Sequence, residues 1–151
     1  MNTIYLDNNA TTNIAPEVLQ EMLPYLKELY GNPSSMHTFG GQLHRKVEEA
    51  RGKVAGLIGA EPEEIIFTSC GTESDNTAIM SAAESLPQKK HIITSRAEHP
   101  AVLNFCKHLA RKGCRITFVP VDKRGQLNMD EFRKALDDGT LIVSLMYANN
   151  E

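Results

Sequence analysis

Apolar runs that favour β-strands alternate with helix-compatible runs from residue 65 to residue 147 of this 151-residue chain. Segments that alternate in this way fold as an α/β layer structure with a mostly parallel sheet. Ligands of such sheets bind beyond the carboxyl ends of the strands. We therefore expect a mostly parallel sheet flanked by helices. The expected strands are residues 65–67, 91–94, 116–121 and 141–147, and the expected helices are residues 77–84, 102–109 and 129–136, the last one capped by Asn128.

The first sixty residues predict helices and loops. Pro16 suits the first turn of a helix, and apolar residues follow at helical spacing over residues 18–29. Pro24 lies inside this pattern, so we expect a kink there or two shorter helices. An apolar stripe opposite a charged face predicts a second helix over residues 43–57, closed by Gly59.

Composition and charge exclude several classes of protein. The net charge is −3 with acids and bases interspersed, so we expect no nucleic-acid partner. The sequence contains no secretory signal pattern and no apolar stretch long enough for a membrane span, so we expect no membrane segment. The cysteines and histidines form no metal-ligand pattern, which predicts no metal site and favours reduced thiols in a cytoplasmic protein. The cysteines are Cys70, Cys106 and Cys114, of which Cys106 is expected in the core.

The turn between residues 65–67 and the helix that follows contains Cys70, Gly71 and Thr72. The amino-terminal end of a helix has unpaired N–H groups and a partial positive charge, which suit an anion. Gly71 lets the backbone approach that anion closely, and the Thr72 hydroxyl can add a hydrogen bond. The structural alternative is that Thr72 only caps the helix.

Chemically useful residues follow three of the expected strands: Gly71 and Thr72, then His99, then Asn149 and Asn150. Each has a structural alternative, because His99 can be a loop or capping residue and the asparagines can be turn residues. Together they suit a planar cofactor that carries a phosphate. The helix end would hold the phosphate, a flat side chain would cover the ring, and an amide would donate to a ring oxygen.

Five blocks of the sequence occur in an order and at intervals that resemble the NifS-type cysteine desulfurases. These enzymes belong to the class V, fold type I, pyridoxal-phosphate family, and the resemblance covers essentially the whole chain. The blocks are residues 5–12, 30–37, 67–76, Glu98-His99-Pro100 and Asn149-Asn150-Glu151.

The resemblance implies a fold and a role for each site residue. Residues 1–15 would be a segment on the small-domain side, and residues 16–151 would be part of the large, cofactor-binding domain, which is incomplete here. Gly71 and Thr72 would bind the phosphate of pyridoxal 5′-phosphate. His99 would stack on the pyridine ring and assist proton transfer. Asn150, rather than Asn149, would hydrogen-bond the phenolic oxygen of the ring. Residues 8–12 and 32–37 would lie near the substrate entrance.

The resemblance also implies the reaction and the partners. The family removes sulfur from L-cysteine, leaves L-alanine, and passes a persulfide sulfur to an iron–sulfur scaffold protein or another acceptor. Its members are homodimers. In the family, the Schiff-base lysine, the acidic residue facing the pyridine nitrogen and the persulfide cysteine lie further along than residue 151. We therefore expect the 151 residues alone to be inactive, and Cys70 to be structural or close to the cofactor.

Three alternatives stay open at this point. A selenocysteine lyase or a class V aminotransferase would share most of these blocks. A truncated, non-catalytic dimerisation module would use the same fold without turnover. A nucleotide-binding domain is disfavoured, because the sequence has neither a Gly-x-Gly-x-x-Gly pattern nor a phosphate-loop lysine after Gly71.

Overall fold

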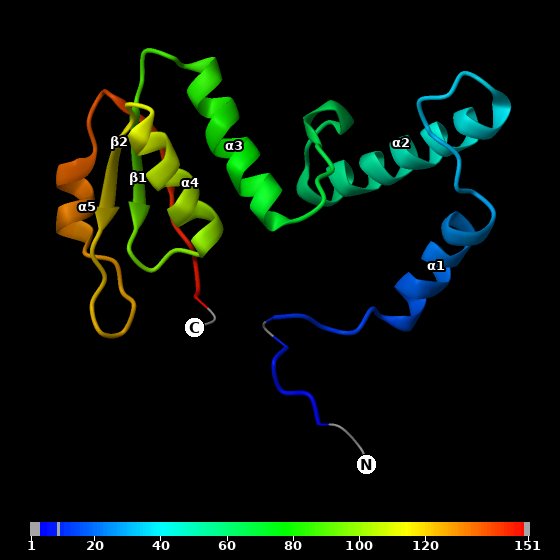
Figure 1. The fold of residues 1–151 in the computed structure, drawn as a ribbon, viewed down its shortest axis with the longest axis horizontal. Coiled ribbons are helices and arrows are strands. Elements are labelled where there is room, and N and C mark those ends of the chain that lie inside the picture. The colour runs from blue at the N-terminus through cyan, green and yellow to red at the C-terminus, as the bar shows by residue number, and fades with distance from the viewer. Residues whose placement is uncertain (1–3, 9, 150–151) are drawn as a thin grey trace. The chain divides into compact units, whose positions relative to one another are not determined.

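The structure is a computed structural model that describes residues 4–8 and 10–149 (Figure 1). It forms two compact units, Met1–Phe67 and Thr68–Glu151. The first is helical and the second is an α/β unit.

The first unit contains helix α1 (Pro16–Lys27), helix α2 (Thr38–Ile58) and a short 3₁₀ helix, η1 (Pro62–Glu64). Pro16 is the first residue of α1, as expected. The helix continues through Pro24 to Lys27, so the expectation of two shorter helices is wrong. Pro24 lies in the last turn of the helix. Proline has no N–H to donate to the preceding turn, but only three helical residues follow Pro24, so the loss of this one bond does not end the helix there.

Helix α2 begins and ends with identifiable caps. The Nδ1 atom of His37 accepts a hydrogen bond from the Gly40 amide at 3.2 Å. Gly59 ends the helix with φ of 69°, in the left-handed region that favours glycine. The predicted helix and its closing glycine are confirmed, and the helix starts five residues earlier than its apolar stripe.

Residues 65–67 do not form a strand, which corrects the first strand prediction. Ile65 is extended, but none of the strands in the described residues pairs with this segment. Instead, the Arg51 guanidinium donates to the Ile65 carbonyl and lies 5.0 Å from the centre of the Phe67 ring. Apolar, β-favouring residues become a strand only where a neighbouring strand supplies the hydrogen-bond ladder.

The second unit contains a parallel sheet of three strands in the order β2-β1-β3. The strands are β1 (His91–Ser95), β2 (Arg115–Val119) and β3 (Thr140–Ser144), and they alternate with helices α3 (Gly71–Ser85), α4 (Pro100–Arg111) and α5 (Met129–Ala135). Asn128 caps α5 by accepting from the amides of Asp130 and Glu131, as predicted. β2 is shorter than expected, since Pro120 has no N–H for the ladder.

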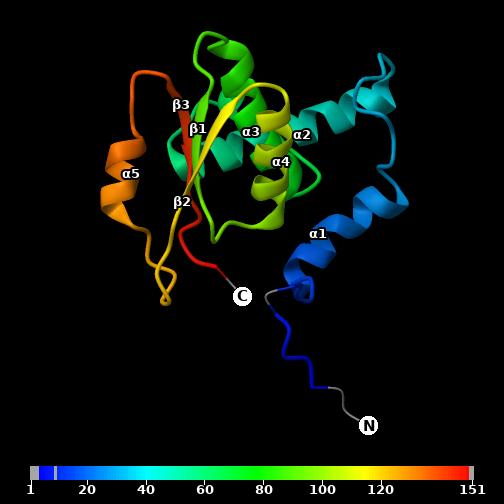
Figure 2. The same ribbon diagram turned by 60° about the vertical axis from the view of Figure 1, so that its left-hand side comes forward.

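Helices cover both faces of this sheet. α3 and α4 lie on one face and α5 lies on the other, as two views of the ribbon show (Figures 1 and 2). The central strand β1 is buried along its whole length, as expected of a parallel strand between two neighbours. The predicted α/β layer structure with a parallel sheet is therefore confirmed for residues 71–144, although the sheet of the described residues has three strands and not the four expected.

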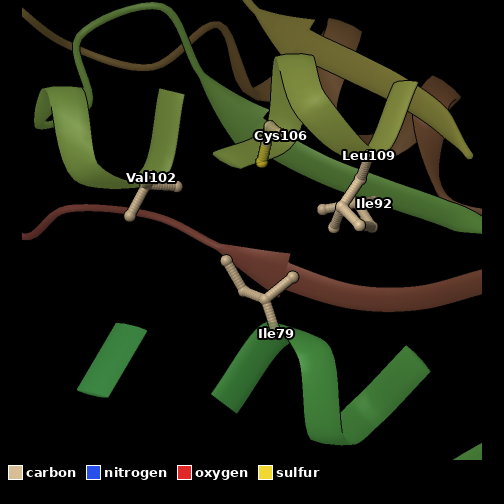
Figure 3. Packing of buried hydrophobic residues seen from close by; sticks show 5 residues of the cluster. All are labelled: Ile79, Ile92, Val102, Cys106 and Leu109. Atoms are coloured by element: carbon tan, nitrogen blue, oxygen red, sulfur yellow. The ribbon is translucent and has the colours of Figure 1, made fainter. Parts of the chain in front are cut away.

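The core lies between β1 and helices α3 and α4 (Figure 3). Cys106 is fully buried there, which confirms that it is a core thiol. Burial, followed by the negative charge of Glu98, raises the pKa of the Cys106 thiol. The side chains in the core are Ile79 from α3, Ile92 from β1, and Val102, Cys106 and Leu109 from α4.

A polar cluster joins the amino-terminal ends of all three strands. The His91 ring is 2% exposed, and its Nε2 atom lies 2.8 Å from the Thr117 hydroxyl. Its Nδ1 atom lies 3.3 Å from the Thr140 hydroxyl and 3.6 Å from an Asp137 carboxylate oxygen. Arg115 pairs with the same carboxylate. Burial of the ring and the Arg115 charge lower the pKa of His91, against the opposing effect of Asp137.

Candidate cofactor site

The turn before α3 is ordered by its own polar side chains. One Glu73 carboxylate oxygen accepts from the Ser69 amide at 2.7 Å and from the Ser69 hydroxyl at 2.6 Å. These bonds hold the pKa of Glu73 below its usual range. The hydroxyls of Thr68 and Ser74 lie 2.6 Å apart. The Glu73 carboxylate, in the first turn of the helix, is therefore hydrogen-bonded to Ser69 and stabilises the conformation of the preceding turn.

Helix α3 begins at Gly71, with Cys70 at the N-cap position. Thr72 is the second residue of the helix, so the alternative in which Thr72 caps it is wrong. The first backbone bond of the helix runs from the Ser74 amide to the Cys70 carbonyl at 3.1 Å. The preceding amides of the first turn have no carbonyl partner of this kind, and they give this end its affinity for negative charge.

Cys70 lies at this helix end and is exposed. The Glu73 amide, the Ser69 hydroxyl and the Thr72 amide lower the pKa of its thiol, in that order of effect. The unpaired amides of a helix amino terminus favour the thiolate form of a cysteine beside them. In the sequence, the position of Cys70 directly before a helix is the signal for this shift.

His99 is the N-cap residue of α4. Its Nδ1 atom accepts from the Ala101 amide at 3.1 Å, so the capping alternative is correct for one edge of the ring. A neutral imidazole whose Nδ1 is an acceptor carries its proton on Nε2. The cap therefore fixes the tautomer of His99 and leaves Nε2–H and the ring faces available to a ligand.

Thr72 and His99 line the same open hollow, of about 470 Å³, although they are 27 positions apart in the sequence. Asn76 also lines it, one helical turn after Thr72 on α3. The Oδ1 atom of Asn76 is buried and has no hydrogen-bond partner among the described residues. Asn76 was not among the site residues expected from the sequence, although its spacing of four from Thr72 places both on the same face of a helix. The remaining lining residues are Pro100, Ala101, Asn104, Phe105 and His108.

The third expected contributor lies after β3. The Nδ2 atom of Asn149 donates to the Ala97 carbonyl at 2.8 Å, and this bond ties the chain after β3 to the chain after β1. Asn150 lies outside the described residues.

A second hollow, of about 630 Å³, opens at the carboxyl edge of the sheet. It is lined by residues that follow all three strands, among them Ala97, Val121 and Leu145. A hollow at this edge is where the parallel topology predicts a ligand.

Among residues 4–8 and 10–149, no cluster of three or more histidine, cysteine, aspartate or glutamate side chains could hold a metal ion. In the same residues, no helix is long and apolar enough to cross a membrane.

Comparisons with known proteins identify the family. The family described as "Aminotransferase class-V" matches residues 4–151. "Cysteine desulfurase 2" of Trichormus variabilis is 58% identical over 151 residues, and "Cysteine desulfurase NifS" of Azotobacter vinelandii is 50% identical over 152 residues. Each alignment covers 100% of this chain and 38% of the relative, so the chain spans well under half the length of these curated relatives.

Solved structures agree with the sequence comparison. A structure titled "NIFS-LIKE PROTEIN" is 46% identical with a TM-score of 0.88, over 95% of this chain and 40% of the other. The crystal structure of DndA from Streptomyces lividans is 39% identical with a TM-score of 0.80, over 98% of this chain and 42% of the other. The chain belongs to the aminotransferase class-V family, and its relatives in that family are cysteine desulfurases.

Proposed function

We propose that this chain is the part of a cysteine desulfurase that binds pyridoxal 5′-phosphate and L-cysteine. The names of its relatives support the reaction class, and a similar structure, 34% identical with a TM-score of 0.84, is titled "SspA in complex with cysteine". The whole enzyme would convert L-cysteine to L-alanine and pass the sulfur to an iron–sulfur scaffold protein or another acceptor. We further propose a cytoplasmic homodimer, with residues 1–15 on the small-domain side of the fold.

One observation carries the proposal. The fold brings Thr72, at the amino terminus of α3, and His99, at the amino terminus of α4, to one hollow. Asn76 lines the same hollow, one helical turn after Thr72, although its Oδ1 atom lies beneath the surface. The hollow therefore offers an anion-binding helix end and a flat ring. This set fits a phosphorylated pyridine.

Each of these residues would contact a different part of the cofactor. The first-turn amides of α3 at Gly71 and Thr72 would bind the phosphate, together with the Thr72 hydroxyl. The His99 ring would stack on the pyridine, and its Nε2–H would face the substrate side. Asn150 would donate to the phenolic oxygen. When bound, the cofactor supplies the electron sink, and the protein supplies position and electrostatics.

The capping bond of His99 defines its hydrogen-bonding role. With Nδ1 accepting from the Ala101 amide, the neutral ring donates through Nε2. We expect His99 to act as a hydrogen-bond donor while α4 is capped.

The proposal is tested by activity of the natural polypeptide that contains these residues. Purified protein with pyridoxal 5′-phosphate should release alanine from L-cysteine, and Thr72→Val and His99→Ala should each lower the rate by about 10- to 1,000-fold. Ser81→Ala, an exposed position of α3, is the matched control and should keep the rate. Full activity in both site variants would contradict the proposed roles.

The 151-residue chain by itself provides a second test. We expect it to release no alanine, because a covalent catalyst needs its nucleophiles and the family supplies these outside the matched region. Steady turnover by the purified 151 residues would contradict this expectation.

A further inference from the structure

Glu98 is a buried carboxylate to which the proposed function gives no role. It is 7% exposed and stands between β1 and α4, next to His99. A buried charge is costly unless hydrogen bonds and favourable potentials compensate it. The contacts of Glu98 therefore need an explanation in the fold.

Its main contact is with the chain that follows β3. The Met146 amide donates to the Glu98 Oε1 atom, across 48 positions of sequence. Because β1 and β3 are parallel neighbours, their carboxyl ends lie side by side, and this bond joins the segments that leave them. The bond from Asn149 to the Ala97 carbonyl is a second tie between the same two segments.

Glu98 also lies close to the beginning of a helix. The residue directly precedes the amino terminus of α4, where the helix dipole stabilises an anion. A hydrogen bond from an amide to an ionised carboxylate is stronger than one between neutral groups. Burial, and after it the nearby Glu98 carboxylate, raises the pKa of the Cys106 thiol, so Glu98 lies close to the core beneath α4.

We propose that Glu98 is a positioning residue, which holds the turn that carries His99 against the segment 145–149. This proposal rests on the proposed function, since the position that it fixes is that of the imidazole over the cofactor. His99 is the adjacent residue, and its own cap to Ala101 sets only the rotation of its ring. The tie from Glu98 to Met146 sets where that ring lies relative to the end of β3.

The test uses the natural polypeptide with pyridoxal 5′-phosphate and four variants. Glu98→Ala removes the tie, whereas Glu98→Gln keeps an acceptor for the Met146 amide. Glu84→Gln makes the same chemical change at an exposed carboxylate of α3, and Leu109→Ala destabilises the core away from the hollow. The readouts are the cofactor dissociation constant, the absorption maximum of the bound cofactor, the thermal midpoint, and the hydrogen exchange rate of the Met146 amide without cofactor.

We expect Glu98→Ala to weaken cofactor binding by about 10- to 100-fold, to shift the absorption maximum and to speed exchange at Met146. Glu98→Gln should recover most of the affinity, Glu84→Gln should match the unchanged protein, and Leu109→Ala should lower the thermal midpoint with little loss of affinity. Equal cofactor binding by Glu98→Ala, or a loss no larger than that of Leu109→Ala, would overturn the positioning role and leave the proposed function standing. Failure of the unchanged protein to bind the cofactor would overturn both.

Discussion

In the unit Thr68–Glu151, apolar side chains of α3, α4 and β1 bury one another, whereas in the unit Met1–Phe67 the apolar stripes of α1 and α2 are largely exposed. Ile92 of β1 is 0% exposed and Leu57 of α2 is 84% exposed. In both units, most helices and strands form where the spacing of apolar residues predicts them. The difference shows that an amphipathic pattern determines the type of element, while burial requires a second element to pack against it.

The largest expected effect contrasts these two positions. In the 151-residue chain, Ile92→Ala should lower the free energy of unfolding by about 2–5 kcal/mol, because it opens a cavity in a filled core. Leu57→Ala should change it by less than about 0.5 kcal/mol. Denaturant unfolding monitored by circular dichroism measures both. A similar loss of unfolding free energy in the two variants would mean that Leu57 is buried as Ile92 is, and would contradict the difference between the two units.

The second prediction concerns the buried His91 cluster, which has no counterpart among the exposed histidines of the first unit. The folded-state pKa of His91 is lowered, so the unfolded chain binds the proton more tightly. The stability that neutral His91 provides is therefore present above the unfolded pKa of about 6.5 and is lost as the pH falls below it. Unfolding free energies between pH 8 and pH 5 should show this decrease.

His91→Gln is the matched variant for this test. It should be less stable by about 1–3 kcal/mol at pH 8, because the Thr117 and Thr140 hydroxyls lose their shared partner. The unfolding free energy of the variant should also decrease less between pH 8 and pH 5 than that of the unchanged protein. An unchanged pH profile in the variant would show that another group causes the decrease.

The smallest effects concern the helix caps in the two units. Asn128→Ala removes two bonds to the first turn of α5 and should cost about 1 kcal/mol, and Asn128→Asp should restore most of it. His37→Ala should fray the first turn of α2, seen as faster amide exchange at Gly40, with less effect on global unfolding. If His37→Ala lowered global stability as much as Asn128→Ala, the first unit would be as cooperative as the second.

The sequence predicted most of the second unit because local patterns and topology agree there. The strands around residues 91–95, 115–119 and 140–144 and the cap at Asn128 were expected for the correct physical reasons. The strand at residues 65–67 failed, because its formation depends on a neighbouring strand that local sequence cannot reveal. The alternative in which Thr72 caps the helix was wrong, because the helix begins at Gly71 and its N-cap residue is Cys70.

The site was predictable in part. Alternation of strands and helices was enough to place Thr72 and His99 at related ends of their elements, and the structure brings them to one hollow. The contacts of Glu98 and His91 depend on residues 26 to 49 positions away, which no local pattern contains. Asn150 lies outside the described residues, so its role stays a prediction.

The most direct measurement compares pyridoxal 5′-phosphate with pyridoxal, which lacks the phosphate, as ligands of the natural polypeptide and of Thr72→Val. If the amino terminus of α3 holds the phosphate, the unchanged protein should bind the phosphorylated form at least about tenfold more tightly. Thr72→Val should reduce that preference and leave the affinity for pyridoxal nearly unchanged. Equal affinities for the two ligands in the unchanged protein would contradict the phosphate site at α3.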